Sequence, residues 1–184
     1  MKATGIVRRI DDLGRVVIPK EIRRTMRIRE GDPLEIYTDR EGEVIFKKYS
    51  PIGELMAFAA QYADTLNKTS GMSVVISDRD VIIACSGVSK KEYTEKKLSS
   101  EIEDIIESRA LYVNSGESTR LPVIEDGGSH YVSCAMPIIS EGDIVGCVAS
   151  IVSNEIQSSA VLGRDVEVKL IQTAASFLGK QLEA

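Results

Sequence analysis

The sequence predicts two domains of different fold class. A β-rich domain is expected over residues 1–50, and an α+β domain, with an antiparallel sheet flanked by helices, over residues 71–184. The first fifty residues hold four short β-branched runs around one short helical run, residues 51–70 carry a helical repeat of apolar side chains, and the rest alternates hairpin-like runs with helical ones. The 184-residue chain is long enough for such an arrangement.

Four short strands are expected in the N-terminal domain. Residues 5–10 and 15–18 are β-branched runs, and residues 11–14 between them form a turn cluster that ends in a glycine. Residues 34–38 and 43–47 are two more such runs, separated by residues typical of a hairpin turn.

A short helix is expected between these two pairs of strands. Pro19 fits the first position of a helix, where its missing N–H is not needed. Ile22 and Met26 lie four residues apart on one face. Arg23 and Arg24 are then expected near the beginning of the helix, beside backbone N–H groups that favour phosphate.

So small a domain cannot cover its apolar side chains alone. A thin layer of this size buries little surface. A dimer in which strands from two chains interleave would supply the missing cover. The side chains that need it are Ile6, Val7, Val16, Val17, Ile18, Leu34, Ile36, Val44, Ile45 and Phe46.

The charge of the chain is concentrated at one end. Residues 1–29 hold nine Lys or Arg against three acids, a formal charge of +6, whereas the whole chain carries −5. Such an asymmetry indicates that the N-terminal end meets a polyanion. A helix-turn-helix would need a second consecutive helix, but Gly31, Pro33 and a β-hairpin occupy its place.

Residues 51–70 are predicted to be a helix with two alternative roles. Ser50 and Pro51 are typical of a helix start, and Gly71 of a helix end. The apolar repeat between them could pack on the C-terminal domain. It also fits two heptads, so the helix could instead link the domains and pair with a second subunit, and two heptads are too short to decide.

The rest of the chain reads as hairpins and helices. Strands are expected at residues 73–76 and 81–85, at 111–113 and 121–124, and in a long hairpin of residues 130–139 and 143–152. Residues 86–97 are polar and irregular. A capping box, Ser100-x-x-Glu103, is expected to open a helix, and apolar residues from Val168 to Leu182 mark a C-terminal helix.

No catalytic, metal or membrane-spanning pattern is present in the sequence. The single histidine, His130, lies in a predicted strand, so a Ser–His–Asp or Cys–His site is not expected and the protein is predicted not to be an enzyme. Cys85, Cys134 and Cys147 are odd in number and widely spaced, which indicates neither a disulfide framework nor a zinc site. No cofactor, metal or membrane partner is expected, and the absence of a signal peptide predicts a cytoplasmic protein.

The N-terminal motif identifies a family. The pattern D-x-x-G-R-[VI]-x-[IL]-P-x-x-[IL]-R is matched without a gap from Asp11 to Arg23, and residues 1 to about 50 resemble the N-terminal domain of the AbrB-type transition-state regulators. The resemblance implies a swapped-hairpin dimer that binds double-stranded DNA in a sequence-specific way. It carries DNA contacts onto Lys2, Arg8, Arg9, Arg15, Arg23 and Arg24.

The order of elements in residues 71–184 resembles a GAF domain, a fold that commonly senses small molecules. Met136-Pro137-Ile138 followed by Gly142-x-Ile144-x-Gly146 is similar to the hairpin of that family. If the domain binds an effector, polar residues beside the strands are the candidates: Ser86, Asn114, Arg120, His130 and Ser133.

The resemblance to these regulators implies a cytoplasmic transcription regulator, an activator and repressor of sporulation-type gene expression. The N-terminal domain would bind DNA as a swapped dimer, and the GAF-like domain would oligomerise, giving a dimer of dimers, and sense a signal. The alternative function is that of an antitoxin, because related swapped-hairpin domains serve that role. An antitoxin usually carries a disordered tail, whereas residues 72–184 have strong strand and helix periodicity.

Overall fold

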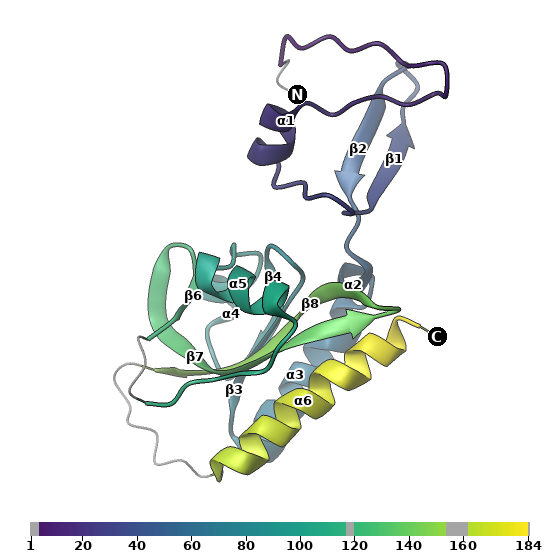
Figure 1. Ribbon diagram of the computed structural model, residues 1–184. Coiled ribbons are helices and arrows are strands. Elements are labelled where there is room, and N and C mark those ends of the chain that lie inside the picture. The colour runs from purple at the N-terminus through teal and green to yellow at the C-terminus, as the bar shows by residue number, and fades with distance from the viewer. Residues whose placement is uncertain (1–3, 117–119, 154–161, 184) are drawn as a thin grey trace. The chain divides into compact units, whose positions relative to one another are not determined.

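The computed structural model describes residues 4–116, 120–153 and 162–183 (Figure 1). The chain divides into two compact units, Met1–Tyr49 and Ser50–Ala184, which we call the N-terminal unit and the C-terminal unit. Among the described residues, none of the helices is both long enough and apolar enough to cross a membrane.

The described part of the N-terminal unit, residues 4–49, contains one helix and one hairpin. Helix α1 spans Lys20–Thr25, and strands β1 (Leu34–Thr38) and β2 (Val44–Lys48) pair antiparallel with Leu34 opposite Lys48. The carboxylate of Asp39 closes the turn of this hairpin by accepting the backbone N–H groups of Glu41 and Glu43. The predicted hairpin is therefore confirmed.

The first two predicted strands are not formed within this chain. Residues 5–10 and 15–18 form no strand, and the turn between them is closed by a backbone hydrogen bond of 3.0 Å from Asp11 N–H to the carbonyl of Arg15. Strand propensity alone does not make a strand, because the backbone groups need a neighbouring strand to pair with.

Helix α1 also differs from its prediction. Pro19 is the residue before the helix, and Arg23 and Arg24 lie in its last turn. In a helix of six residues the fourth and fifth positions already belong to the last turn, so the predicted position of these arginines near the beginning of the helix is wrong. Their contact with phosphate stays a prediction. Cations in the last turn instead suit the negative end of the helix dipole.

Residues 51–70 form two helices. The hydroxyl of Ser50 accepts the N–H of Gly53 and caps α2 (Pro51–Glu54), after which the chain breaks at Leu55 and continues as α3 (Met56–Ser70). Gly71 ends α3 in the left-handed conformation, with φ 73°. Helix α3 packs on the sheet of the C-terminal unit through Ala59, Ala63 and Leu66, while its pairing with a second subunit stays a prediction.

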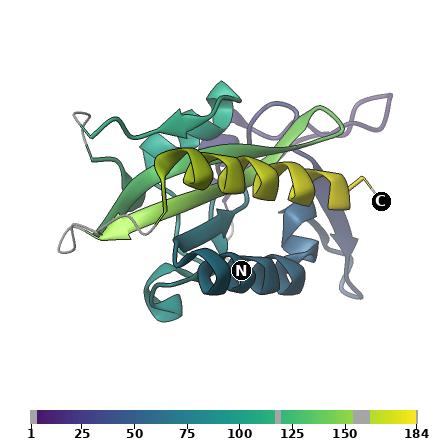
Figure 2. The ribbon, with the colours of Figure 1, turned by 90° about the horizontal axis from the view of Figure 1, so that it is seen from below.

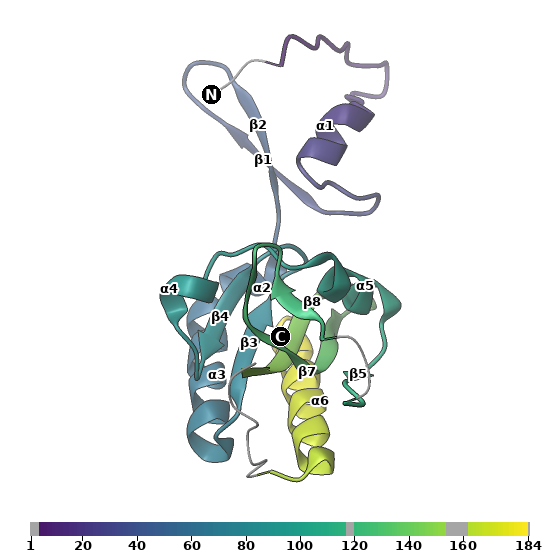
Figure 3. The same ribbon diagram turned by 90° about the vertical axis from the view of Figure 1, so that its left-hand side faces the viewer.

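One antiparallel sheet organises the C-terminal unit (Figure 3). Its strand order is β4-β3-β8-β7-β5, and β6 pairs with β7 beside β5. The long hairpin of β7 and β8 turns at Glu141 and Gly142, both at positive φ. The strands are β3 (Ser73–Ser77), β4 (Ile82–Ser86), β5 (Tyr112–Val113), β6 (Pro122–Ile124), β7 (Gly127–Ser140) and β8 (Asp143–Ser153).

Helices cover both faces of this sheet. Helices α3 and α6 (Arg164–Gln181) run alongside each other on one face (Figure 2). Helices α4 (Lys90–Tyr93) and α5 (Ser100–Ser108) pack on the other, where Tyr93 and Ile102 are fully buried. The predicted α+β class, an antiparallel sheet flanked by helices, is confirmed.

Two details of the helices on the second face were predicted wrongly. The N-cap of α5 is Ser99 rather than Ser100, because the hydroxyl of Ser99 accepts the N–H of Ile102. Helix α4 lies in residues 86–97, which were expected to be irregular. It is one turn long, and its apolar contribution is the single side chain of Tyr93, which is too little to produce a sequence period.

Candidate nucleic-acid interface

The predicted DNA-binding residues lie on three segments of the N-terminal unit. Arg8 and Arg9 are exposed in residues 5–10, and Arg15 is exposed just after the turn. Arg24 is exposed and Arg23 half-buried in the last turn of α1. Lys2 lies outside the described residues. These positions put four exposed guanidinium groups on the one unit of the chain whose first 29 residues are strongly basic.

The turn before Arg15 is built around the carboxylate of Asp11. Its Oδ1 accepts the backbone N–H groups of Leu13 at 3.0 Å and Arg15 at 2.7 Å. Its Oδ2 accepts the Nε–H of Arg15 at 2.8 Å. The backbone N–H of Arg15 first, and its guanidinium second, lower the pKa of Asp11 below 3.8. Gly14, at φ 77°, supplies the left-handed residue that the turn requires.

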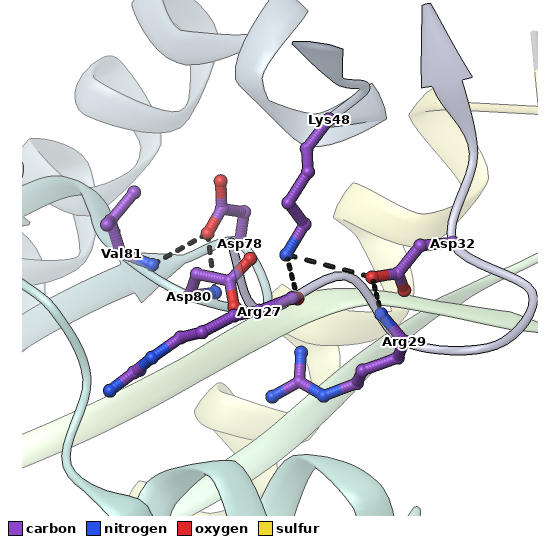
Figure 4. A network of polar contacts seen from close by, with 7 residues as sticks. All are labelled: Arg27, Arg29, Asp32, Lys48, Asp78, Asp80 and Val81. Atoms are coloured by element: carbon purple, nitrogen blue, oxygen red, sulfur yellow. Dashed lines mark hydrogen bonds and ion pairs between the residues drawn. The ribbon is translucent and has the colours of Figure 1, made fainter. Parts of the chain in front are cut away.

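A polar network holds the chain between α1 and the hairpin (Figure 4). The ammonium group of Lys48 donates to the carbonyl of Arg27 at 2.9 Å and lies 3.7 Å from the carboxylate of Asp32. That carboxylate accepts the N–H of Arg29 at 2.7 Å, and its side chain is 3% exposed. The network fixes the end of α1 to β2, and so positions the helix that carries Arg23 and Arg24.

Within residues 4–49, the N-terminal unit has no apolar core of its own. None of its residues from 4 to 49 is buried. Twelve of the fifteen large apolar side chains that are exposed in the described chain belong to it. Val7 is 84% exposed, and Ile10, Leu13 and Val17 are about 70% exposed. Exposed apolar surface of this extent, next to a basic turn, is typical of a site where another molecule binds.

The five candidate effector residues lie at separate places in the C-terminal unit. Ser86 is buried and donates to Asp64 at 3.2 Å. Asn114 is buried beside β7, and its backbone N–H donates to the carbonyl of Ser133. The guanidinium of Arg120 lies over the ring of Tyr131.

His130 is part of a contact that the sequence analysis did not predict. Its Nδ1 lies 2.9 Å from the hydroxyl of Tyr93 and 2.9 Å from that of Ser129. Tyr93 is 37 residues away, on the one-turn helix α4, so no local pattern could have paired the two residues. Burial raises the pKa of Tyr93.

A hollow of about 460 Å³ lies beside this contact, and none of the five candidates lines it. Among the described candidates, a hydrogen bond joins Asn114 and Ser133, through the backbone N–H of Asn114 and the carbonyl of Ser133. Effector binding by the five residues stays a prediction. The residues around the hollow are Ser89, Lys91, Glu92, Lys96, Ile124, Asp126 and Gly128. In the described parts of the chain, no three His, Cys, Asp or Glu side chains are grouped to hold a metal ion.

Comparison with known proteins gives matches over both units. Residues 54–183 match the family described as stage V sporulation protein T C-terminal, transcription factor. Residues 7–53 match the family described as antidote-toxin recognition MazE, bacterial antitoxin.

Three individual proteins illustrate these matches. The chain is 53% identical to stage V sporulation protein T of Bacillus subtilis (strain 168) over 186 residues, covering 100% of this chain and 99% of that protein. It is 49% identical to the transition state regulatory protein AbrB of the same organism over 77 residues, covering 42% of this chain and 78% of AbrB. The GAF domain of the nutrient sensor CodY from Clostridium difficile is 15% identical, with a TM-score of 0.43, and the match covers 67% of this chain and 83% of that domain.

A basic N-terminal unit related to AbrB, followed by an α+β unit, defines a two-domain transcription regulator. The chain belongs to the stage V sporulation protein T family of transcription factors. The predicted membership of the AbrB-type regulators is thereby confirmed.

Proposed function

We propose that this transcription factor binds double-stranded DNA as a swapped dimer of its N-terminal units. The DNA contacts would come from Lys2, Arg8, Arg9, Arg15, Arg23 and Arg24. Regulation of genes for spore formation, by activation and repression, is the role that this family membership favours, and it would be exercised in the cytoplasm without enzymatic activity.

The observation that carries the dimer is the uncovered apolar surface of the N-terminal unit. Ile6, Val7 and Ile10 on one segment, and Val16 and Val17 on the other, are between 40% and 84% exposed. Both segments are rich in β-branched residues, yet neither forms a strand in this chain. Exchange of hairpins between two copies would provide strand partners and bury the apolar side chains in one step.

The arginines supply the chemistry for DNA. A guanidinium group can bind a phosphate, or the O6/N7 edge of guanine, through two parallel hydrogen bonds. In a dimer each position occurs twice, so Arg8, Arg15, Arg23 and Arg24 would give about eight positive contacts. The net negative charge of the remaining residues opposes unspecific attraction to DNA.

A second contact between C-terminal units would join two dimers into a tetramer. Phe58, Tyr62 and Phe177 form an aromatic cluster on α3 and α6, with ring centroids 5.4–6.3 Å apart. Phe177 is 40% exposed, and Met56 at the start of α3 is 46% exposed, which leaves apolar surface on these helices open to a partner. Two linked DNA-binding dimers would gain avidity through effective concentration.

An antitoxin is the second candidate, because residues 7–53 match a family named for that role. A toxin-binding antitoxin of this kind carries a disordered segment. Here residues 54–183 match a transcription-factor family instead, and the described residues from 50 onwards fold around a six-stranded sheet. Copurification of a small toxin with the chain would favour the antitoxin.

The proposal is tested by measuring DNA affinity for the wild type and four variants: Arg8→Ala, Arg15→Ala, Arg23→Ala and Arg24→Ala. A duplex selected from a random pool by the wild-type protein serves as the probe. Loss of a bidentate base contact is expected to cost roughly 1–3 kcal/mol. Arg40→Ala is the matched control, because Arg40 is exposed in the β1–β2 turn of the same unit. Unchanged affinity in all four variants would overturn the proposal.

A further inference from the structure

Asp11 and Arg15 are joined by hydrogen bonds in both directions within the proposed interface. The two oxygens of the Asp11 carboxylate have different partners, since Oδ1 accepts two backbone N–H groups of the turn and Oδ2 accepts the Nε–H of Arg15. In the opposite direction, the backbone N–H of Asp11 donates to the carbonyl of Arg15. Asp11 therefore both closes the turn and holds the guanidinium of Arg15 in place.

The contact through Nε decides which edge of the guanidinium can meet DNA. A guanidinium presents donors along its side, at Nε and one Nη, and along its end, at Nη1 and Nη2. The side edge faces Asp11, and the side chain of Arg15 is still 69% exposed. The end edge is thus the one offered to a ligand, and its two parallel donors match the O6 and N7 acceptors of guanine.

The charge of Asp11 then distinguishes between two ligands of that edge. A phosphate would place a second anion on a guanidinium whose charge a carboxylate already offsets at 2.8 Å. A guanine edge is neutral and meets no such repulsion. From these contacts we infer that Asp11 is a positioning and specificity-determining residue, which makes Arg15 a reader of guanine rather than of phosphate. The inference rests on the proposed function, since it assumes that this turn meets DNA.

Asp11→Asn separates the charge from the shape of the turn. The amide oxygen of asparagine can still accept the backbone N–H groups of Leu13 and Arg15, as asparagine commonly does in such turns. The negative partner of Nε is lost. Asp12→Asn is the matched control, because Asp12 is the next residue, is exposed, and removes the same charge from the same turn.

The experiment compares affinity for the selected duplex with affinity for a scrambled duplex of the same composition, at several salt concentrations. The full chain is used as wild type, Asp11→Asn, Asp12→Asn and Arg15→Ala. For Asp11→Asn we expect tighter binding to the scrambled duplex, a steeper salt dependence, and a specificity ratio that falls roughly 5- to 150-fold. Substitution of one G·C pair in each half-site should then become tolerated. Asp12→Asn should change binding to both duplexes alike and leave the ratio unchanged.

Three results would overturn the inference while leaving the proposed function intact. One is a wild-type specificity ratio retained by Asp11→Asn; a role confined to the fold of the turn would weaken both duplexes by the same factor and give that result. Another is an equal fall of the ratio in Asp11→Asn and Asp12→Asn, which would assign the effect to net charge. The third is an Arg15→Ala protein that binds both duplexes as the wild type does, since the other arginines would still carry the proposed function. If the wild type shows no preference for its selected duplex, the proposed function itself fails first.

Discussion

Gly179 lies where helix α6 touches the β7–β8 hairpin, and we predict that its replacement by alanine destabilises the C-terminal unit. A Cβ atom added there would lie 2.2 Å from the carbonyl oxygen of Ile139. Ordinary contact begins at 3.4 Å, so helix and strand would have to separate by about 1.2 Å. The obstacle is backbone rather than the end of a flexible side chain, which places the cost near the upper end of the ~1–3 kcal/mol typical of overpacking.

Helix propensity acts in the opposite direction. Alanine in a helix interior is favoured over glycine by about 1 kcal/mol. The net expectation for Gly179→Ala is therefore a loss of about 2 kcal/mol in the free energy of unfolding of the C-terminal unit. Urea denaturation followed by circular dichroism measures this loss as a lower midpoint at unchanged slope. Ser176→Ala, at an exposed position of the same helix, is the control that gains propensity without a clash. A Gly179→Ala protein more stable than the wild type would refute the close approach of α6 to Ile139.

Three further predictions concern single groups. Because Arg15 lowers the pKa of Asp11, the contact between the two side chains is present above pH 3.8 and is lost as the pH falls through the lowered pKa. An NMR titration of the Asp11 carboxyl carbon measures this pKa. A titration midpoint at or above 3.8 would contradict the prediction. Burial raises the pKa of Cys134 and of Cys147 to about 12. Neither thiol should therefore react with a disulfide reagent at pH 8 until urea unfolds the protein. Rapid labelling of the native protein would contradict this prediction. Tyr93→Phe removes the hydroxyl that contacts His130 and leaves Ser129 as a hydrogen-bond partner of His130. This substitution should lower the free energy of unfolding by about 1 kcal/mol. An unaltered urea midpoint would show that the contact between Tyr93 and His130 does not stabilise the fold.

Local patterns predicted the elements of the C-terminal unit well. The hairpin of β7 and β8 was recognisable because two long β-branched runs flank a turn with a glycine, and the end of α3 because Gly71 follows an apolar repeat. The order of the strands in the sheet could not be predicted from such local patterns. Strand β8 lies between β3 and β7, and its pairing of Val75 with Ala149 joins residues more than seventy positions apart. Long-range pairing depends on packing of the whole unit rather than on neighbours in sequence.

The N-terminal unit shows the reverse relation. Its composition predicted strands at residues 5–10 and 15–18, and the single chain does not form them. The proposed swapped dimer would supply the missing strand partners. The number of apolar residues in so small a unit had already indicated a second copy. The arginines proposed to contact DNA were chosen from charge and motif, whereas the role inferred for Asp11 rests on its three contacts in the structure. The sequence pattern D-x-x-G-R contains that signal, since an aspartate at the start of a turn commonly binds the backbone ahead of it.

The salt dependence of DNA binding by the full chain tests the central claim most directly. If all four arginines per chain contacted phosphate in a dimer, the logarithm of the binding constant would fall with the logarithm of salt concentration with a slope of roughly −7, and if Arg15 reads guanine, the remaining three give roughly −5. Arginines that read bases instead reduce this magnitude, so a steep slope of up to that size is predicted for the selected duplex. A slope near zero, or no binding at low salt, would contradict the account.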